Sequence, residues 1–248
     1  GCWEEMAIPQ PTWISRQTII DNGWQKYVDA NAPVRGFGRA LLPEEVRMQM
    51  LYALGCGARG LFSYTDASEA GSSLIFHSSA ELPEIWQEIG RNVRDLRLIS
   101  PLLEVGNQMD WAQCNRKYLW LSTLWCADKA AIVVAVNETA QSDTKGLTLK
   151  PVENALYGFA DLPGVKGQAV YRVENEDFTL LKSWRSAGQI NWVDEKVTAG
   201  AIYLISPDDD LTEDLLKTYK TDLPIATEAG RAVPAESYLK GRRFFTDK

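Results

Sequence analysis

The sequence predicts an α/β segment followed by an all-β segment. Up to about residue 106, short apolar runs alternate with stretches of helical periodicity, which is the alternation of an α/β domain. Between Tyr118 and Ile205, short apolar runs are separated by glycine, proline and asparagine, which is typical of an antiparallel β-sandwich. We therefore divide the chain into residues 1–106, residues 107–207, and a C-terminal helix with an extended arm at 208–248.

The first segment carries two predicted helices. One begins at Pro43, because proline is tolerated in a first helical turn and the following Glu44 and Glu45 suit its positive end, and it ends at Gly55. The other spans residues 82–100. Its expected buried face is an apolar stripe of Ile85, Ile89, Val93 and Leu96. Short apolar runs at residues 6–9 and 59–65 are predicted strands, so the order is strand, helix, strand, helix.

The second segment begins with a predicted hairpin, in which residues 118–125 and 131–136 flank a turn at 127–130. Further strands are expected at 146–150, 168–173, 178–184, 189–193 and 200–205. In the third segment, Thr212 is the predicted N-cap of one short helix.

Composition and charge exclude some functions. The 248 residues carry a formal net charge of −7, which disfavours nucleic acid as a partner because phosphate binding needs a basic face. No apolar run is long enough to span a membrane as a helix. The four cysteines form no CxxC pair and there is one histidine, so we expect neither a zinc site nor another cofactor. A bridge between Cys114 and Cys126 stays open.

One block of the first segment resembles a known family. The run from Pro43 to Arg47, together with Tyr52-Ala53-Leu54-Gly55-Cys56-Gly57-Ala58-Arg59-Gly60-Leu61-Phe62-Ser63-Tyr64, resembles the last βα unit of glycoside-hydrolase (β/α)8 barrels. Ile8-Pro9-Gln10 with Trp13 resembles the strand before it. In many such enzymes a last helix and a β-sandwich follow in the order found here, so the resemblance implies the C-terminal βα units of a TIM-like barrel and then an antiparallel sandwich.

The chain departs from this family in length. A full barrel needs about 250 residues, whereas about 106 precede the sandwich here, which is room for roughly two of eight βα units. Either an N-terminal barrel segment or partner chain completes the barrel, or the first segment is a different small α/β arrangement. We favour completion by a missing segment, because isolated barrel strands would expose their edges.

Four residues are the candidate substrate-binding set. Gln10, at the end of the first predicted strand, can donate to and accept from sugar hydroxyls. Trp13 and Tyr64 are candidate platforms for pyranose rings, against the alternative of core packing. Asp66, directly after the second strand, could accept from a sugar hydroxyl or cap its own loop.

The catalytic residues stay unknown. Glycoside hydrolysis needs two carboxyls flanking the scissile bond, and in a barrel they stand at the C-terminal strand ends. Gln10 can neither protonate a leaving group nor act as nucleophile, so we expect the catalytic carboxylates to lie outside this chain. A weaker set of candidates, for which a structural role is favoured, comprises Arg35, Arg39, Glu69, His77 and the sandwich residues Trp120, Trp125, Trp184 and Trp192.

These observations predict a carbohydrate-active protein. The chain would be the C-terminal portion of a glycoside-hydrolase-like enzyme, acting on an oligosaccharide or glycoside and contributing one wall of the sugar cleft. Whether the chain is itself catalytic stays open. The alternative is a non-catalytic carbohydrate-binding or assembly module. Enzymes of this kind are often exported, which favours a secreted or periplasmic location without establishing it.

Overall fold

The computed structural model describes residues 42–59, 83–139, 141–143, 146–161, 169–207 and 210–232. Its helices are α3 (Pro43–Gly55), α4 (Pro83–Leu98), α5 (Ser100–Leu103) and α6 (Asp210–Ala232). Its strands are β1 (Asn107–Met109), β2 (Ala112–Cys114), β3 (Leu119–Cys126), β4 (Ala130–Asn137), β5 (Gln141–Asp143), β6 (Gly146–Thr148), β7 (Val152–Ala160), β8 (Ala169–Glu174), β9 (Asp177–Leu180), β10 (Ser183–Ser186), β11 (Gln189–Val197) and β12 (Gly200–Ser206).

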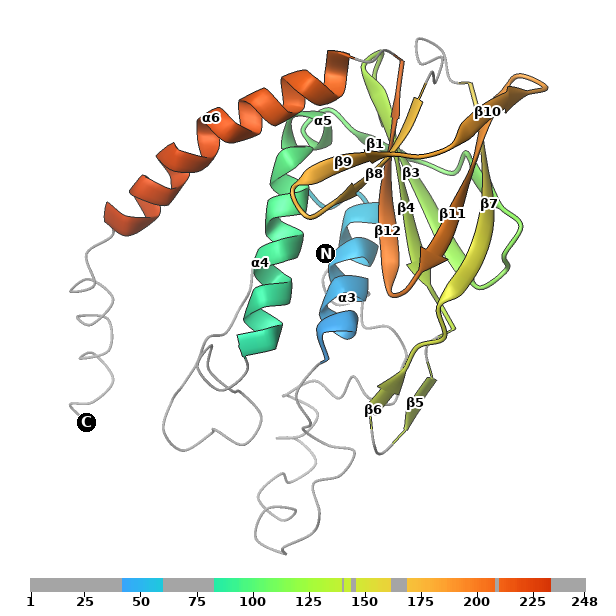
Figure 1. Cartoon of the computed structure of the whole chain (residues 1–248), viewed down its shortest axis with the longest axis horizontal. Helices are drawn as coiled ribbons and strands as arrows, with labels where there is room; N and C mark the ends of the chain where they lie inside the picture. Colours follow the sequence, from blue (N-terminus) through green and yellow to red (C-terminus); the bar gives the residue numbers. More distant parts are fainter. Residues whose placement is uncertain are drawn as a thin grey trace, which may run out of the picture. The chain divides into compact units, whose positions relative to one another are not determined.

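Two antiparallel sheets form the sandwich expected between residues 107 and 207 (Figure 1). The larger sheet has six strands in the order β1-β3-β4-β12-β8-β9, and the smaller has the order β10-β11-β7-β2. β5 and β6 form a separate two-stranded ribbon. The predicted hairpin is confirmed, because β3 pairs antiparallel with β4 from Leu119↔Asn137 to Cys126↔Ala130.

A layer of apolar side chains joins the two sheets. It includes Val133 and Ala135 from β4, Tyr203 from β12, and Phe159 and Trp192 from the smaller sheet. The alternation of side chains along each strand sends these residues to one face of their sheet. They are almost completely removed from water, so this layer is the hydrophobic core of the sandwich.

The opposite face of the six-stranded sheet is covered by helix α3. Ser122 donates a hydrogen bond of 2.6 Å to the carbonyl oxygen of Gly55, at the end of α3. Leu51 of α3 lies directly over Gly200, at the start of β12. β4 is therefore buried on both faces, which explains its continuous apolar sequence, Ala-Ala-Ile-Val-Val-Ala-Val.

Both helices of the first segment begin and end close to the predicted residues, but one buries an unexpected face. Among the described side chains of α4, the buried ones are Glu88, Asn92 and Asp95, which recur at helical spacing, together with Leu98. Of the stripe predicted to be buried, Val93 is 46% exposed. Ile89 and Leu96 of the expected apolar face are half-buried and the side chain of Ile85 lies outside the described residues, so the fully buried stripe of α4 is the polar one that it turns towards α3.

The barrel itself stays a prediction. In the described ranges every strand pairing is antiparallel, and the arrangement is a helix-covered sandwich of the α+β kind. Both strands expected in the barrel, residues 6–9 and most of 59–65, lie outside the described residues. The division of the chain at residues 106 and 207 is likewise an expectation that the structure leaves open.

Two smaller expectations are corrected, and the open question of a cysteine bridge is answered. The strand predicted at 178–184 is two strands, β9 and β10, which belong to different sheets. Cys114 and Cys126 are separate thiols and form no bridge. Helix α6 belongs to a second unit, Asp210–Lys248, and its 23 residues make it much longer than the short helix predicted from Thr212.

Candidate functional site

The four residues predicted to bind sugar, Gln10, Trp13, Tyr64 and Asp66, lie outside the described residues and stay predictions. The same holds for Arg35, Arg39, Glu69 and His77.

Three of the four sandwich tryptophans have packing roles. Trp192 is completely buried and stacks on Tyr157, with ring centroids 5.1 Å apart. Trp125 packs against the same core, whereas Trp120 faces α3 and approaches Gly55. The favoured structural interpretation is therefore confirmed for these three. Trp184, on strand β10, is 43% exposed.

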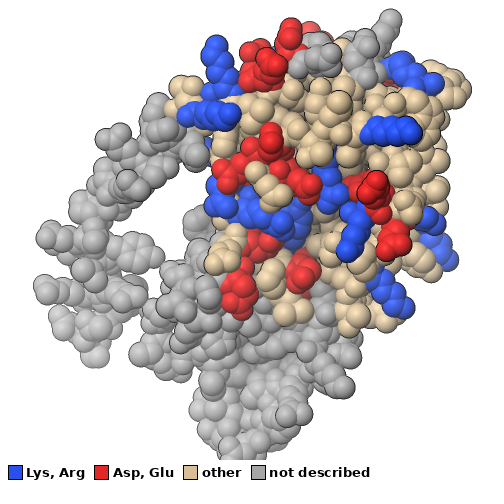
Figure 2. All heavy atoms as spheres, viewed as in Figure 1, with Lys and Arg blue, Asp and Glu red and all other residues tan. Residues whose placement is uncertain are grey.

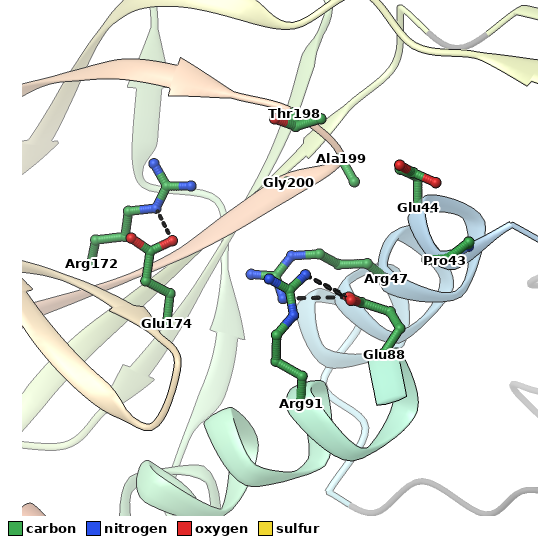
Figure 3. A pocket seen from close by; sticks show the side chains of 10 residues that line it. All are labelled: Pro43, Glu44, Arg47, Glu88, Arg91, Arg172, Glu174, Thr198, Ala199 and Gly200. Atoms are coloured by element: carbon green, nitrogen blue, oxygen red, sulfur yellow. Dashed lines mark hydrogen bonds and ion pairs between the residues drawn. The ribbon is translucent and has the colours of Figure 1, made fainter. Parts of the chain in front are cut away.

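Between α3, α4 and the six-stranded sheet lies a polar cavity of about 320 Å³, which we call the arginine cavity (Figure 3). Acidic and basic side chains also gather side by side on the face of the molecule shown in Figure 2. The residues that line the arginine cavity are Pro43, Glu44, Arg47, Glu88, Arg91, Arg172, Glu174, Thr198, Ala199 and Gly200.

Local sequence explains how the two helices supply their part of the wall. Helix α3 begins at Pro43, and its Glu45 carboxylate accepts a 2.8 Å hydrogen bond from the N–H of Leu42, which fixes the first turn. Arg47 lies in the next turn and faces α4. Its guanidinium donates a hydrogen bond to Asn92 of α4, so this contact between the two helices is polar.

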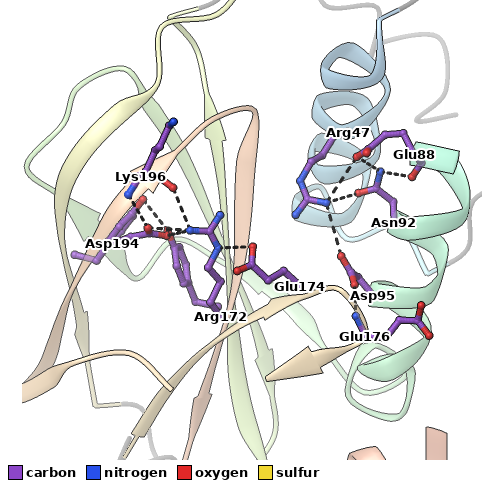
Figure 4. Close-up of polar contacts among 11 residues, drawn as sticks. Arg47, Glu88, Asn92, Asp95, Arg172, Glu174, Glu176, Asp194 and Lys196 are labelled. Carbon is purple, nitrogen blue, oxygen red and sulfur yellow. Dashed lines mark hydrogen bonds and ion pairs between the residues drawn. The ribbon is translucent and has the colours of Figure 1, made fainter. Parts of the chain in front are cut away.

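Arg47 is a buried cation with few partners. Its side chain is 8% exposed, and Nη1 donates a 2.7 Å hydrogen bond to Oδ1 of Asn92 (Figure 4). The nearest carboxylate oxygens, on Asp95 and Glu88, are 3.7 and 3.9 Å from Nη1. Among the described residues, Arg47 makes no other side-chain hydrogen bond, so most of its N–H groups have no protein acceptor.

Glu88 is occupied by other groups. Its carboxylate accepts hydrogen bonds of 2.8 Å from Nη2 of Arg91 and from Nδ2 of Asn92. Nε of Arg91 does not take part in this hydrogen bond. It is buried and has no acceptor in the described part of the chain. Glu88 therefore holds α4's own side chains in place and does not satisfy Arg47.

The sheet side of the cavity presents a third guanidinium. Nη1 of Arg172 donates to both carboxylate oxygens of Asp194, at 2.9 Å each, and Nε lies 3.0 Å from Oε2 of Glu174 (Figure 4). Asp194 also accepts a 2.7 Å hydrogen bond from the hydroxyl of Tyr203, deep between the sheets. These bonds fix Arg172 at the edge of the sandwich.

The electrostatics of the cavity leave Arg47 under-compensated. Burial lowers the pKa of Arg47, repulsion from Arg91 lowers it further, and the attraction of Asp95 and Glu88 opposes both effects. Burial also raises the pKa of Asp95, against the effect of the backbone N–H of Glu176. The arrangement can therefore offer hydrogen-bond donors to an electron-rich group.

In the described ranges, no group of three or more histidine, cysteine, aspartate or glutamate residues could hold a metal ion. No helix there is long and apolar enough to cross a bilayer.

Sequence reasoning missed Arg47, Arg91 and Arg172 as site residues. Arg47 belongs to the block that carries the family resemblance, but nothing in that pattern gives it a role. The available signal was the spacing of Glu88, Asn92 and Asp95, which places three polar groups on one face of α4. A charged helix face normally points to solvent, so this signal alone did not predict burial.

Comparisons with known proteins give little further information. No family model matches the chain, and no curated protein matches it. Among solved structures, it is similar to the alpha-L-fucosidase isoenzyme 2 from Paenibacillus thiaminolyticus, with 11% sequence identity and a TM-score of 0.33. The alignment covers 53% of this chain and 18% of the fucosidase, so the chain spans less than a fifth of that enzyme. A likeness at this level carries no argument about activity.

Proposed function

We propose that this chain is the C-terminal portion of a carbohydrate-active protein of the glycoside-hydrolase barrel type. In this proposal α3 and α4 are the last helices of the barrel, and the sandwich braces them. Gln10, Trp13, Tyr64 and Asp66 would form one wall of a sugar cleft. The two carboxyls needed for glycosidic bond cleavage would come from the part of the barrel that this chain lacks.

One observation carries the proposal: the helix pair is joined to an antiparallel sandwich in the chain order of such enzymes. Arg59 strengthens it, because this basic residue of the resembling block donates to the carbonyl oxygens of Leu103, Glu104 and Gly106. These three carbonyl groups belong to the segment that runs from the end of α5 to the first sandwich strand, β1. Arg59 thus ties the start of the predicted last barrel strand to the sandwich, as a bracing role requires.

The first test is the intact mass and activity of the gene product purified from its source. We expect a mass well above the 27.7 kDa of this chain and hydrolysis of at least one member of a panel of aryl glycosides. A mass near 27.7 kDa without hydrolysis would contradict the proposal.

Substitutions in the active gene product then test the cleft. Trp13→Ala should lower kcat/KM about tenfold or more, because a sugar-stacking ring contributes on the order of 1 kcal/mol or more. Trp111→Ala, which removes an exposed indole from the segment between β1 and β2, is the matched control and should leave kcat/KM unchanged. Equal effects of the two substitutions on kcat/KM would contradict the assignment of Trp13 to the sugar cleft.

The non-catalytic sugar-binding module is the second candidate, and the exposed ring of Trp184 is the described feature that favours it. In that case oligosaccharides should quench tryptophan fluorescence of this chain, and Trp184→Ala should abolish the quenching. No quenching across a broad sugar panel would exclude this candidate.

A further inference from the structure

We propose that the arginine cavity binds a polar carboxylic acid of about monosaccharide size, with its carboxylate on Arg47. This site is separate from the predicted sugar cleft, and the inference does not depend on the proposed function.

The first argument is the set of unused donors at Arg47. A guanidinium has five N–H donors, and the one hydrogen bond that Arg47 makes within the described part of the chain is to Asn92. Its side chain is nevertheless 8% exposed, and its guanidinium points into the cavity (Figure 3). The nearest carboxylate oxygens, on Asp95 and Glu88, lie 3.7 and 3.9 Å from Nη1, beyond hydrogen-bond distance, so an acceptor in the cavity that takes up the unused donors would stabilise this arrangement.

The second argument is that three guanidinium groups line one space. Arg91 contributes a buried Nε without an acceptor among the described residues, and Arg172 faces it from the sheet. Burial, followed by repulsion from Arg91 and Arg172, lowers the pKa of Arg47, against the attraction of Asp95 and Glu88. A carboxylate at this point would add to that attraction, and planar guanidinium groups bind carboxylates through paired hydrogen bonds.

The glutamates of the cavity do not fill this role. Glu88 accepts from Arg91 and Asn92, and Glu174 forms its ion pair with Arg172. Glu44 is exposed in the first turn of α3, where it borders the opening of the cavity. Glu88 and Glu174 thus bind other arginines, and Asp95, the nearest carboxylate to Arg47, lies 3.7 Å from Nη1 without a hydrogen bond to it, so the remaining N–H donors of Arg47 are available to a ligand.

Size and wall chemistry decide what the remainder of the ligand can be. A volume of about 320 Å³ lies at the lower end of the range of small-molecule pockets. The wall opposite the helices is formed by Thr198, Ala199 and Gly200, whose side chains are small. The lining is otherwise charged, so a hydroxylated acid suits it and an apolar one does not.

The test is isothermal titration of the full chain with sodium glucuronate, at constant ionic strength. Glucose provides the same size without the charge, and sodium acetate and inorganic phosphate provide charge without the size. We expect saturable 1:1 binding of glucuronate, with acetate, phosphate and glucose at least about tenfold weaker because each lacks part of the recognition.

Variants locate the binding. Arg47→Met should weaken glucuronate binding about tenfold or more through loss of a charge-assisted hydrogen bond. Arg116→Met is the matched control: Arg116 is exposed and donates to the carbonyl oxygens of Glu153 and Asn154, so affinity should not change. If Arg47→Met does not fold, as judged by circular dichroism, Arg91→Gln takes its place, because the Arg91 side chain is 39% exposed.

Three results would overturn the inference. They are no binding of glucuronate, equal binding of glucose or of the small anions, and unchanged affinity in the folded Arg47→Met or Arg91→Gln variant. Because the readout is direct binding, none of them bears on glycoside hydrolysis. Failure of the glycoside assay likewise leaves this site unaffected.

Discussion

Gly200 has no space for a side chain beneath Leu51. A Cβ atom built on this glycine would lie 2.5 Å from Cδ1 of Leu51 and 2.4 Å from the backbone oxygen of Ala135. The glycine therefore sets the distance between helix α3 and the six-stranded sheet, and also forms part of the wall of the arginine cavity.

Gly200→Ala should destabilise the protein by about 2 to 3 kcal/mol, because overpacking against a backbone oxygen forces the helix or the strand to move. Gly90→Ala is the matched control on helix α4. Among the described residues its Cβ would meet only the flexible end of Arg94, at 3.2 Å, so the gain in helix propensity should stabilise the protein by about 0.5 to 1 kcal/mol. Urea unfolding of both variants measures the contrast, and a neutral Gly200→Ala would show that α3 is not held tightly on the sheet.

Asp95 should make stability depend on pH. Burial raises its pKa in the folded state, so just above the unfolded pKa the folded protein keeps a proton that the unfolded chain releases. The contribution of Asp95 to the free energy of unfolding therefore decreases as pH rises from its pKa in the unfolded chain to its pKa in the folded protein. Above the folded-state pKa this contribution is constant. The Asp95→Asn variant has no carboxyl group at this position to titrate. The free energy of unfolding of the wild type should therefore fall relative to that of the variant as pH rises. Urea unfolding at a series of pH values from 4 to 8 measures the difference, and a constant difference would refute the prediction.

The hydroxyl of Tyr203 should contribute strongly to stability, because it donates a hydrogen bond of 2.7 Å to the buried carboxylate of Asp194. Tyr203→Phe removes a hydrogen bond to a charged group and should cost about 1.5 to 3 kcal/mol. Tyr157→Phe is the control, since it removes a longer contact of 3.1 Å between two hydroxyls and should cost about 1 kcal/mol or less. Chemical denaturation measures the free energy of unfolding of the two variants. A larger loss of stability in Tyr157→Phe than in Tyr203→Phe would contradict the prediction that the hydrogen bond from Tyr203 to Asp194 is the stronger of the two.

Most of the sandwich could be predicted from the sequence, and the principal omission has a local cause. The hairpin of β3 and β4 was predicted because both strands are apolar and a turn separates them. Strand β7 was missed: Val152 and Ala155 are both buried, an odd spacing that breaks the period of two. The irregularity lies at Asn154, whose φ of 48° departs from the extended conformation, although the pairing with β11 keeps the same register on both sides, at Asp194↔Ala155 and Lys196↔Glu153.

The face of α4 and the arginine cavity could not be predicted for a related reason. Periodicity identifies which residues share a helix face, but the partner of that face depends on the tertiary structure. The apolar stripe around Val93 and the polar stripe around Asn92 are both continuous along the helix, and Arg47 lies 45 residues away from Asn92 in the chain. Only the packing of α3 against α4 selects the polar stripe for burial.

The close contact of Gly200 with Leu51 also affects motion. With Trp120 equally close to Gly55, at 2.6 Å from a Cβ built there, the two ends of the contact between α3 and the sheet interlock and oppose sliding. Arg59, four residues beyond Gly55, is in turn bound to the segment that leads into β1. These contacts couple helix α3 and Arg59 to the sandwich, so we expect them to move with it as one rigid body.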